Sequence, residues 1–162
     1  MNQVQQATPP QLTVVSWPDT VVEACGHRPG SPYIEAVWLG VLGPSATWAW
    51  QRLARIAAGR PGVTIDSADL AISVGLGENL GPNAAISRTL GRLVVFGAAQ
   101  RGAEVIAVRL ALPDLTPRCA ARLSASARLA HEQLGRNHPP RRLATPLSPT
   151  VEQPASVAGM SL

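Results

Sequence analysis

The apolar pattern of the chain changes from a helical period to a strand period between residues 84 and 112. Over residues 84–97, apolar side chains recur with the spacing of one helix face, which predicts an amphipathic helix. The inward stripe of this helix consists of Ile86, Leu90, Leu93, Val94 and Gly97. Over residues 104–112, apolar side chains alternate with others, which predicts a half-buried strand. Gly102 and Ala103 suit a tight turn before that strand, so the pattern predicts a helix followed by a β-hairpin.

Proline, glycine and capping residues divide the rest of the chain into further elements. The sequence predicts a strand at 13–17, one or two helical turns within 19–26, helical segments at 33–42, 45–59, 67–75 and 117–134, and a short extended piece at 63–65. Pro44 either starts a new helix or kinks a continuous one. Asp66 or Ser67 is a suitable N-cap for the helix at 67–75, and Asn83 for the helix at 84–97.

Residues 13–135 form one predicted domain between two tails. The chain has 162 residues, which is enough for one domain with its own hydrophobic core. Residues 1–12 and 136–162 lack apolar periodicity and are polar or rich in proline, so we expect both tails to be disordered. No apolar run is long enough to cross a membrane, and the N-terminus has no signal-peptide pattern. We therefore expect a cytoplasmic protein without a membrane partner.

The charge of the chain permits an anionic partner without requiring one. All 14 basic residues are arginine, against 10 acidic residues, for a formal net charge of +4. Arginine without lysine is typical of a GC-rich bacterial genome and does not by itself indicate a function. The placement of the arginines along the fold therefore has to decide whether they form a nucleic-acid-binding surface.

The middle of the chain resembles a winged helix-turn-helix domain of MarR-like and related bacterial transcription regulators. Residues 66–75 (DSADLAISVG) correspond to the supporting helix, and residues 83–96 (NAAISRTLGRLVVF) to the recognition helix. Phe96-Gly97-Ala98 matches the position where such domains turn into the wing, at about 98–112. The resemblance covers residues 45–112. The connection between the two helices, at 75–82, is longer than the usual turn of about three or four residues.

The resemblance implies a fold class and a function. The expected fold is mainly α-helical with a small β-hairpin, extended by N-terminal elements and a C-terminal helix. The expected function is that of a transcription regulator that binds double-stranded DNA as a homodimer. Helix 84–97 would lie against the DNA and the wing would add contacts.

Candidate DNA-binding residues follow from the outward face of helix 84–97 and from the wing. A helical wheel places Ala84, Arg88, Gly91, Arg92 and Val95 outward, with Ser87 at the edge. No acidic residue occurs between Glu78 and Glu104, so Arg88 and Arg92 are unopposed in sequence. Arginine contacts phosphates or reads guanine edges. The candidate DNA-binding residues are Asn83, Ala84, Ser87, Arg88, Arg92, Gln100, Arg101 and Arg109.

Catalytic and metal-binding motifs are weak, so we expect no enzyme, no cofactor and no metal. The glycine-rich loop at 75–82 lacks the Lys-Ser/Thr pair of a Walker A loop and follows a helix instead of a strand. Cys25 and Cys119 are too few for a disulfide framework, and neither has a partner at metal-ligand spacing. Cys25 and His27 are close in sequence but lack an evident third ligand.

The alternative function is a winged-helix protein-interaction module within a larger assembly. Trp38 and Trp50 lie in apolar surroundings that indicate core packing, whereas Trp48 shares a predicted helix face with Arg52 and Arg55. Trp48 either packs under the N-terminal segment or marks a partner surface, together with helix 117–134. A connected basic patch over helix 84–97 and the wing favours DNA binding, and a split patch favours the interaction module.

Overall fold

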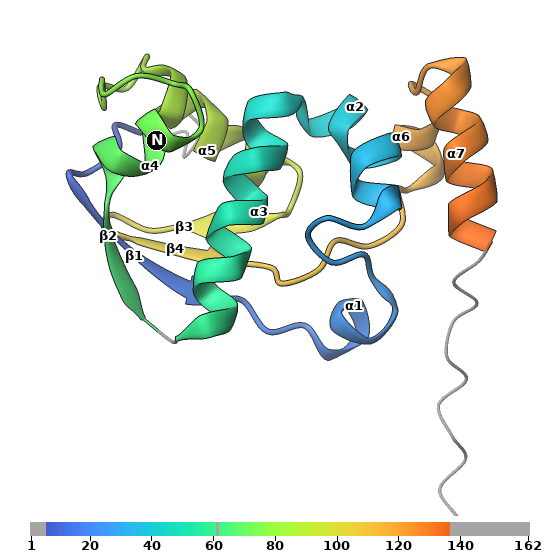
Figure 1. Cartoon of the computed structure of the whole chain (residues 1–162), viewed down its shortest axis with the longest axis horizontal. Coiled ribbons are helices and arrows are strands. Elements are labelled where there is room, and N and C mark those ends of the chain that lie inside the picture. Colours follow the sequence, from blue (N-terminus) through green and yellow to red (C-terminus); the bar gives the residue numbers. More distant parts are fainter. Residues whose placement is uncertain (1–5, 61, 137–162) are drawn as a thin grey trace, which may run out of the picture.

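The computed structural model describes residues 6–60 and 62–136, which form a mixed α/β fold (Figure 1). Helix α3 crosses one face of a sheet, while α6 and α7 lie at the opposite end of the molecule from α4. The elements in chain order are β1 (Gln11–Ser16), α1 (Thr20–Cys25), the π-helical segment η2 (Ile34–Trp38), α2 (Leu39–Leu42), α3 (Pro44–Gly59), β2 (Val63–Asp66), α4 (Ser67–Ser73), α5 (Ala85–Val95), β3 (Ala99–Arg101), β4 (Val105–Val108), α6 (Pro117–Ala120) and α7 (Ala125–Arg136).

The predicted helix and hairpin at 84–112 are confirmed as α5, β3 and β4, although β4 ends at Val108 and not at Leu112. Ile86, Leu90 and Leu93 of α5 are fully buried, as the inward stripe requires. Strands β3 and β4 pair antiparallel, and the Gly102 N–H donates to the Val105 carbonyl at 2.8 Å across the turn. Gly97, with φ of 68°, links helix to hairpin in a conformation that a side chain would disfavour.

The sheet is larger than the small hairpin that the sequence predicts. Four strands lie in the order β2-β1-β4-β3, with β1 antiparallel to β2 and parallel to β4. The order of elements from α3 to β4 matches the predicted helix, strand, helix, helix and hairpin, but the N-terminal strand inserts between β2 and β4. Sequence periodicity predicts strands and not their partners, which explains the difference.

Pro44 starts a new helix. Gly43 has a φ of 79°, which breaks the chain direction between α2 and α3, and Pro44 occupies the first turn of α3. The predicted inward face of this helix is confirmed, since Trp50 and Leu53 are fully buried. The Trp50 indole N–H donates to the Arg109 carbonyl at 3.0 Å, which ties α3 to the segment after β4.

The prediction that residues 1–12 are disordered is wrong for the part that the structure describes. Leu12 is fully buried in β1, and Thr8 is 3% exposed. The Thr8 N–H donates to the Leu80 carbonyl at 2.9 Å, so the segment is bonded to the loop before α5. The buried side chains of Thr8 and Leu12 and the backbone hydrogen bonds therefore hold residues 6–12 in place, although their composition indicates disorder. Residues 1–5 lie outside the described part.

The predicted single helix at 117–134 is two helices. Thr116 caps α6, with its hydroxyl accepting from the Cys119 N–H at 3.4 Å. The Ser124 hydroxyl accepts from the Ala127 N–H at 3.3 Å at the start of α7. A second capping residue in the middle of an apolar stripe therefore divides the helix. The predicted disordered tail at 136–162 lies, apart from Arg136, outside the described residues.

We predict that the N-terminal strand is required for stability. Leu12→Ala removes a fully buried side chain and should lower the free energy of unfolding by about 2–5 kcal/mol. Gln11→Ala, at the exposed neighbouring position, should change it by less than about 0.5 kcal/mol. Urea denaturation of both variants checks this, and equal effects would contradict the role of β1 in the core.

Candidate nucleic-acid interface

The eight predicted DNA-binding residues fall into an exposed group and a buried group. The exposed ones are Asn83, Arg88, Arg92 and Gln100. The prediction that Ala84, Gly91 and Ser87 face outward or lie at the edge of α5 is wrong, because all three are buried. Arg101 is also buried, and Arg109 is partly buried. The candidate surface is therefore smaller than the sequence predicts.

Ser87 is turned inward by the N-terminal segment. Its hydroxyl lies 2.8 Å from the Thr8 hydroxyl and donates to the Leu80 carbonyl at 3.3 Å. The loop at 75–82 is thus bonded to the start of α5 through Leu80. Ala84, not Asn83, is the N-cap residue of α5, and no side chain caps this helix.

Arg101 holds the N-terminal segment. It is only 6% exposed, and its guanidinium donates to the carbonyls of Gln6 at 3.1 Å and Ala7 at 2.9 Å and to the Thr8 hydroxyl at 3.1 Å. Burial lowers the pKa of Arg101. The inward orientation of Arg101 follows from the alternation of side chains along β3. Ala99 and Arg101 lie on the buried side of the strand, and Gln100 faces out.

Arg109 is bound within the fold as well. Its guanidinium forms an ion pair with the Asp19 carboxylate, donates from Nε to the Gly97 carbonyl at 2.9 Å, and stacks over the Trp17 ring at 4.1 Å. The hydrogen bond from Arg109 is the largest cause that lowers the pKa of Asp19. These contacts join the segment before α1 to the turn between α5 and β3, so Arg109 is not available as a wing contact.

An open groove runs along the outer face of α5 and contains the exposed arginines. One part lies between α5 and the junction of α2 and α3, and includes Arg88, Arg92 and Phe96. The adjoining part reaches α6 and includes Arg92, Phe96 and Arg122. The two parts adjoin at Arg92 and Phe96, and together we call them the α5 groove. None of the described residues that line it is acidic.

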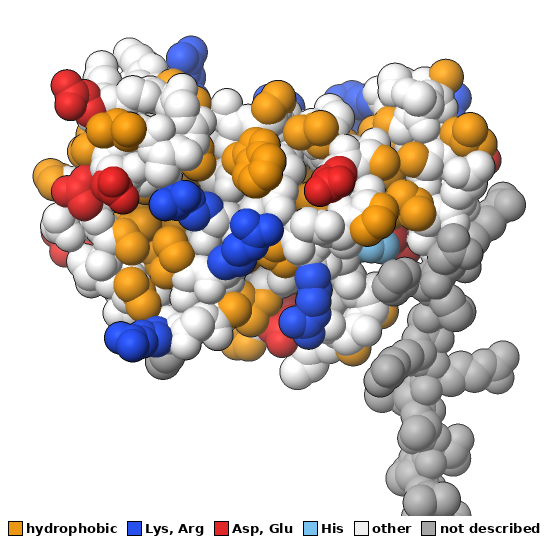
Figure 2. Space-filling model, in the orientation of Figure 1, with side chains coloured by type: hydrophobic (Ala, Val, Ile, Leu, Met, Phe, Trp, Pro, Cys, Tyr) orange, Lys and Arg blue, Asp and Glu red, His pale blue; other side chains and the backbone are white. Residues whose placement is uncertain are grey.

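The arginines of the α5 groove differ in how they are held. Arg92 donates from Nη2 to the Val41 carbonyl at 2.6 Å and packs over the Phe96 ring at 5.4 Å, so its position is fixed. Arg88 and Arg122 are exposed. Figure 2 shows basic side chains along the upper edge of the molecule, the edge at which α5 and α6 lie in Figure 1. Sequence reasoning missed Arg122, because only the tertiary fold brings α6 to α5.

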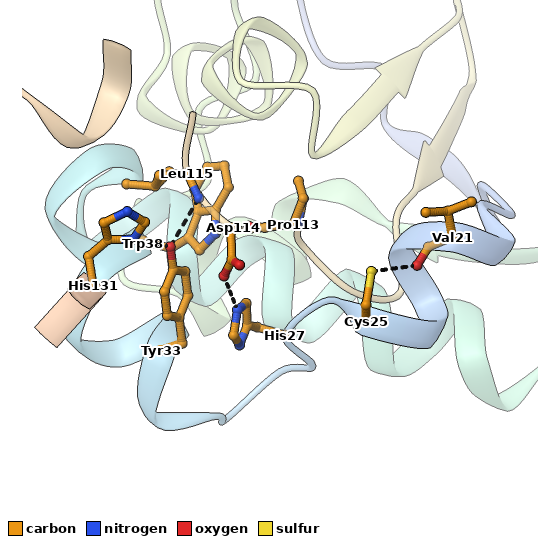
Figure 3. A network of polar contacts seen from close by, with 9 residues as sticks. All are labelled: Val21, Cys25, His27, Tyr33, Trp38, Pro113, Asp114, Leu115 and His131. Atoms are coloured by element: carbon orange, nitrogen blue, oxygen red, sulfur yellow. Dashed lines mark hydrogen bonds and ion pairs between the residues drawn. The ribbon is translucent and has the colours of Figure 1, made fainter. Parts of the chain in front are cut away.

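A partly buried polar network near α7 has a structural role (Figure 3). The His27 ring stacks on Tyr33 with centroids 3.8 Å apart, and its Nε2 lies 2.7 Å from Asp114 Oδ1. The Tyr33 hydroxyl accepts from the Leu115 N–H at 3.0 Å and lies 2.6 Å from His131 Nδ1. The network therefore joins η2 and its preceding loop to α7.

The structure does not bring Cys25 and His27 together as a site. The Cys25 thiol donates to the Val21 carbonyl at 3.0 Å and points away from His27 in Figure 3. Across the described residues, no group of three or more His, Cys, Asp or Glu side chains could hold a metal ion. Within the same part of the chain, no helix is long and apolar enough to span a membrane.

Comparisons of the chain with protein-family models, with curated proteins and with solved structures find no match.

The Tyr33 network predicts a stability change at high pH. Burial raises the pKa of Tyr33 from 10.0 to about 12, so the folded protein retains the phenolic proton where the unfolded chain loses it. The free energy of unfolding should therefore be unaffected by Tyr33 below pH 10.0 and fall as pH rises toward about 12. The chain has one tyrosine and no lysine, so few other groups titrate in this window.

Tyr33→Phe is the matched variant for this measurement. It should unfold with a free energy that changes much less between pH 10.0 and about 12, as followed by urea denaturation at a series of pH values. It should also be less stable than the parent at neutral pH, because the Leu115 N–H loses its acceptor. An equal slope in both proteins would contradict the assignment.

Proposed function

We propose that this chain is a DNA-binding protein that contacts the phosphate backbone through the α5 groove. The observation that carries the proposal is the pair of adjoining hollows that contain Arg88, Arg92 and Arg122, with no acidic residue among the described residues that line them. Arginines supply most of the affinity for a nucleic-acid backbone, and acidic neighbours would oppose it. The resemblance to a winged helix-turn-helix adds that the chain is a bacterial transcription regulator in the cytoplasm.

The proposed contacts differ in role because the arginines differ in freedom. Arg92, held by the Val41 carbonyl, suits a phosphate at a fixed position. Arg88 is exposed on the same helix and has the reach to contact either a phosphate or a guanine edge. Of the wing residues, Gln100 stays in the proposal, while Arg101 and Arg109 are assigned to the fold instead.

A homodimer is part of the proposal. Winged-helix regulators bind two half-sites with a two-fold axis, and a second copy would need an apolar surface outside the α5 groove. Helix α7 offers Leu129, which is 55% exposed, at the end of the molecule remote from β2. A dimer through α7 would place two α5 grooves on one assembly.

The second candidate function is a protein-interaction module in a larger assembly without sequence-specific DNA binding. The observation that favours it is the split of the basic patch: Arg101 and Arg109 are bound internally, so the exposed arginines of α5 do not continue onto the wing. Absence of duplex binding in the following experiment would favour this candidate.

The experiment measures duplex affinity of an Arg88→Ala, Arg122→Ala variant by fluorescence anisotropy at several salt concentrations. Both side chains are exposed, so the free energy of unfolding should change by no more than about 0.5 kcal/mol per site. If both contact phosphate, the slope of log affinity against log salt should flatten by about two units.

Arg60→Ala is the matched control. This substitution also removes an exposed positive charge. Arg60 follows the C-terminal end of α3, whereas Pro44, at the N-terminal end of the same helix, lines the α5 groove. It should leave the slope unchanged. A double variant that folds and binds duplex with the parent's affinity and slope would overturn the proposal.

A further inference from the structure

Trp48 is exposed to an extent that the fold does not explain. It leaves 58% of its surface accessible, whereas Trp50 on the same helix is fully buried and Trp38 is 4% exposed. An exposed indole forgoes the stabilisation that burial of a large aromatic side chain supplies. The N-terminal segment does not cover it, since that segment packs on the start of α5 instead.

Trp48 borders a hollow between α3 and the end of α4. The residues that line it are Trp48, Arg52, Arg55, Ile56, Ser73 and Val74, and we call it the Trp48 hollow. Figure 2 shows this face of the molecule, where hydrophobic and basic side chains lie next to one another over α3. The hollow therefore combines a flat aromatic surface with positive charge.

The two arginines of the hollow are placed to act together with the indole. Arg52 and Arg55 follow Trp48 by four and seven positions, so all three lie on one face of α3. Neither forms an ion pair with any residue in 6–60 or 62–136; Arg55 donates to the Gln51 amide oxygen at 3.4 Å. No acidic side chain lines the hollow, and α3 carries no acidic residue.

We propose that the Trp48 hollow binds single-stranded nucleic acid, with a base stacked on the Trp48 indole and the adjacent phosphates held by Arg52 and Arg55. An aromatic platform flanked by arginines is the arrangement that sequence-tolerant single-strand binders use. A duplex keeps its base faces stacked internally, so it would engage the arginines and leave the indole without a partner. An acidic peptide would likewise use the charges and not the flat ring.

This site goes beyond the proposed function and does not depend on it. The α5 groove and the Trp48 hollow are lined by different residues, although α3 begins in the groove at Pro44 and reaches Trp48 about one turn later. The experiment can therefore separate the two surfaces by substituting each alone.

The experiment titrates the full chain with oligothymidylate of about 12 nucleotides and follows tryptophan fluorescence. The parent should be quenched on binding, because the exposed indole stacks on a base. Trp48→Ala should lose the quenching and bind about tenfold more weakly, and Trp48→Phe should retain part of the affinity. Thermal melts of these variants verify folding, which an exposed position leaves intact.

Charge variants test the phosphate contacts. Arg52→Ala, Arg55→Ala should flatten the salt dependence of oligothymidylate binding by about 1.4 units, the value for two phosphates on a single strand. Arg60→Ala should leave that slope unchanged. Arg88→Ala, Arg122→Ala should leave oligothymidylate affinity unchanged and weaken duplex binding alone, so failure of one surface is distinguishable from failure of the other.

Three results would overturn the proposal. The first is that oligothymidylate does not quench the parent. The second is that folded Trp48→Ala binds as tightly as the parent. The third is that polyglutamate quenches and competes as well as oligothymidylate, which would identify the hollow as a docking site for an acidic protein segment.

Discussion

The buried guanidinium of Arg101 organises the N-terminal half of this fold. A charge is costly to remove from water unless hydrogen bonds replace its solvent. Two backbone carbonyls and the Thr8 hydroxyl do so for the Nη atoms of Arg101, while its buried Nε has no partner among the described residues. Thr8 in turn contacts Ser87 at the start of α5. The chain beyond Thr8 then enters the sheet as β1, between β2 and β4. One arginine therefore joins the hairpin, the N-terminal segment and α5.

That arrangement separates the arginines by role. Arg101 and Arg109 bind groups of the same chain and stabilise the junctions between elements. Arg88, Arg52 and Arg55 are exposed and form no ion pair among the described residues. Exposed arginines without counter-charges retain the capacity to bind an anion from solution. Both proposed surfaces, the α5 groove and the Trp48 hollow, contain arginines of this second kind, and the α5 groove adds Arg92, which is held by the Val41 carbonyl.

The sequence predicted local elements well and long-range contacts poorly, for physical reasons. The stripe of Ile86, Leu90 and Leu93 determines a helix face by itself, and Asp66 caps α4 by accepting from the Asp69 N–H at 2.8 Å. Helical spacing also separated Trp48 from the buried face that contains Trp50, but it left open whether another segment covers Trp48. The inward turn of Ser87 depends on Thr8, 79 positions away, and no local pattern encodes that contact.

The same limit applies to the candidate site. Arg88 and Arg92 were predictable as outward residues of one helix, because they lie four positions apart and therefore share one helix face. Arg122 joins them only through the packing of α6 near α5. Arg101 was predicted as a wing contact from the resemblance to a winged helix. The alternation of β3 places it on the buried side instead.

The most direct test of this account compares Arg101→Ala with Gln100→Ala in both urea denaturation and duplex binding. If Arg101 holds the fold, its removal should lower the free energy of unfolding by about 1–3 kcal/mol, since two backbone carbonyls and the buried Thr8 hydroxyl lose their donor. The protein that remains folded should bind duplex with the parent's affinity, and Gln100→Ala should keep the parent's stability. An Arg101→Ala protein with unchanged stability and weakened duplex binding would contradict the account.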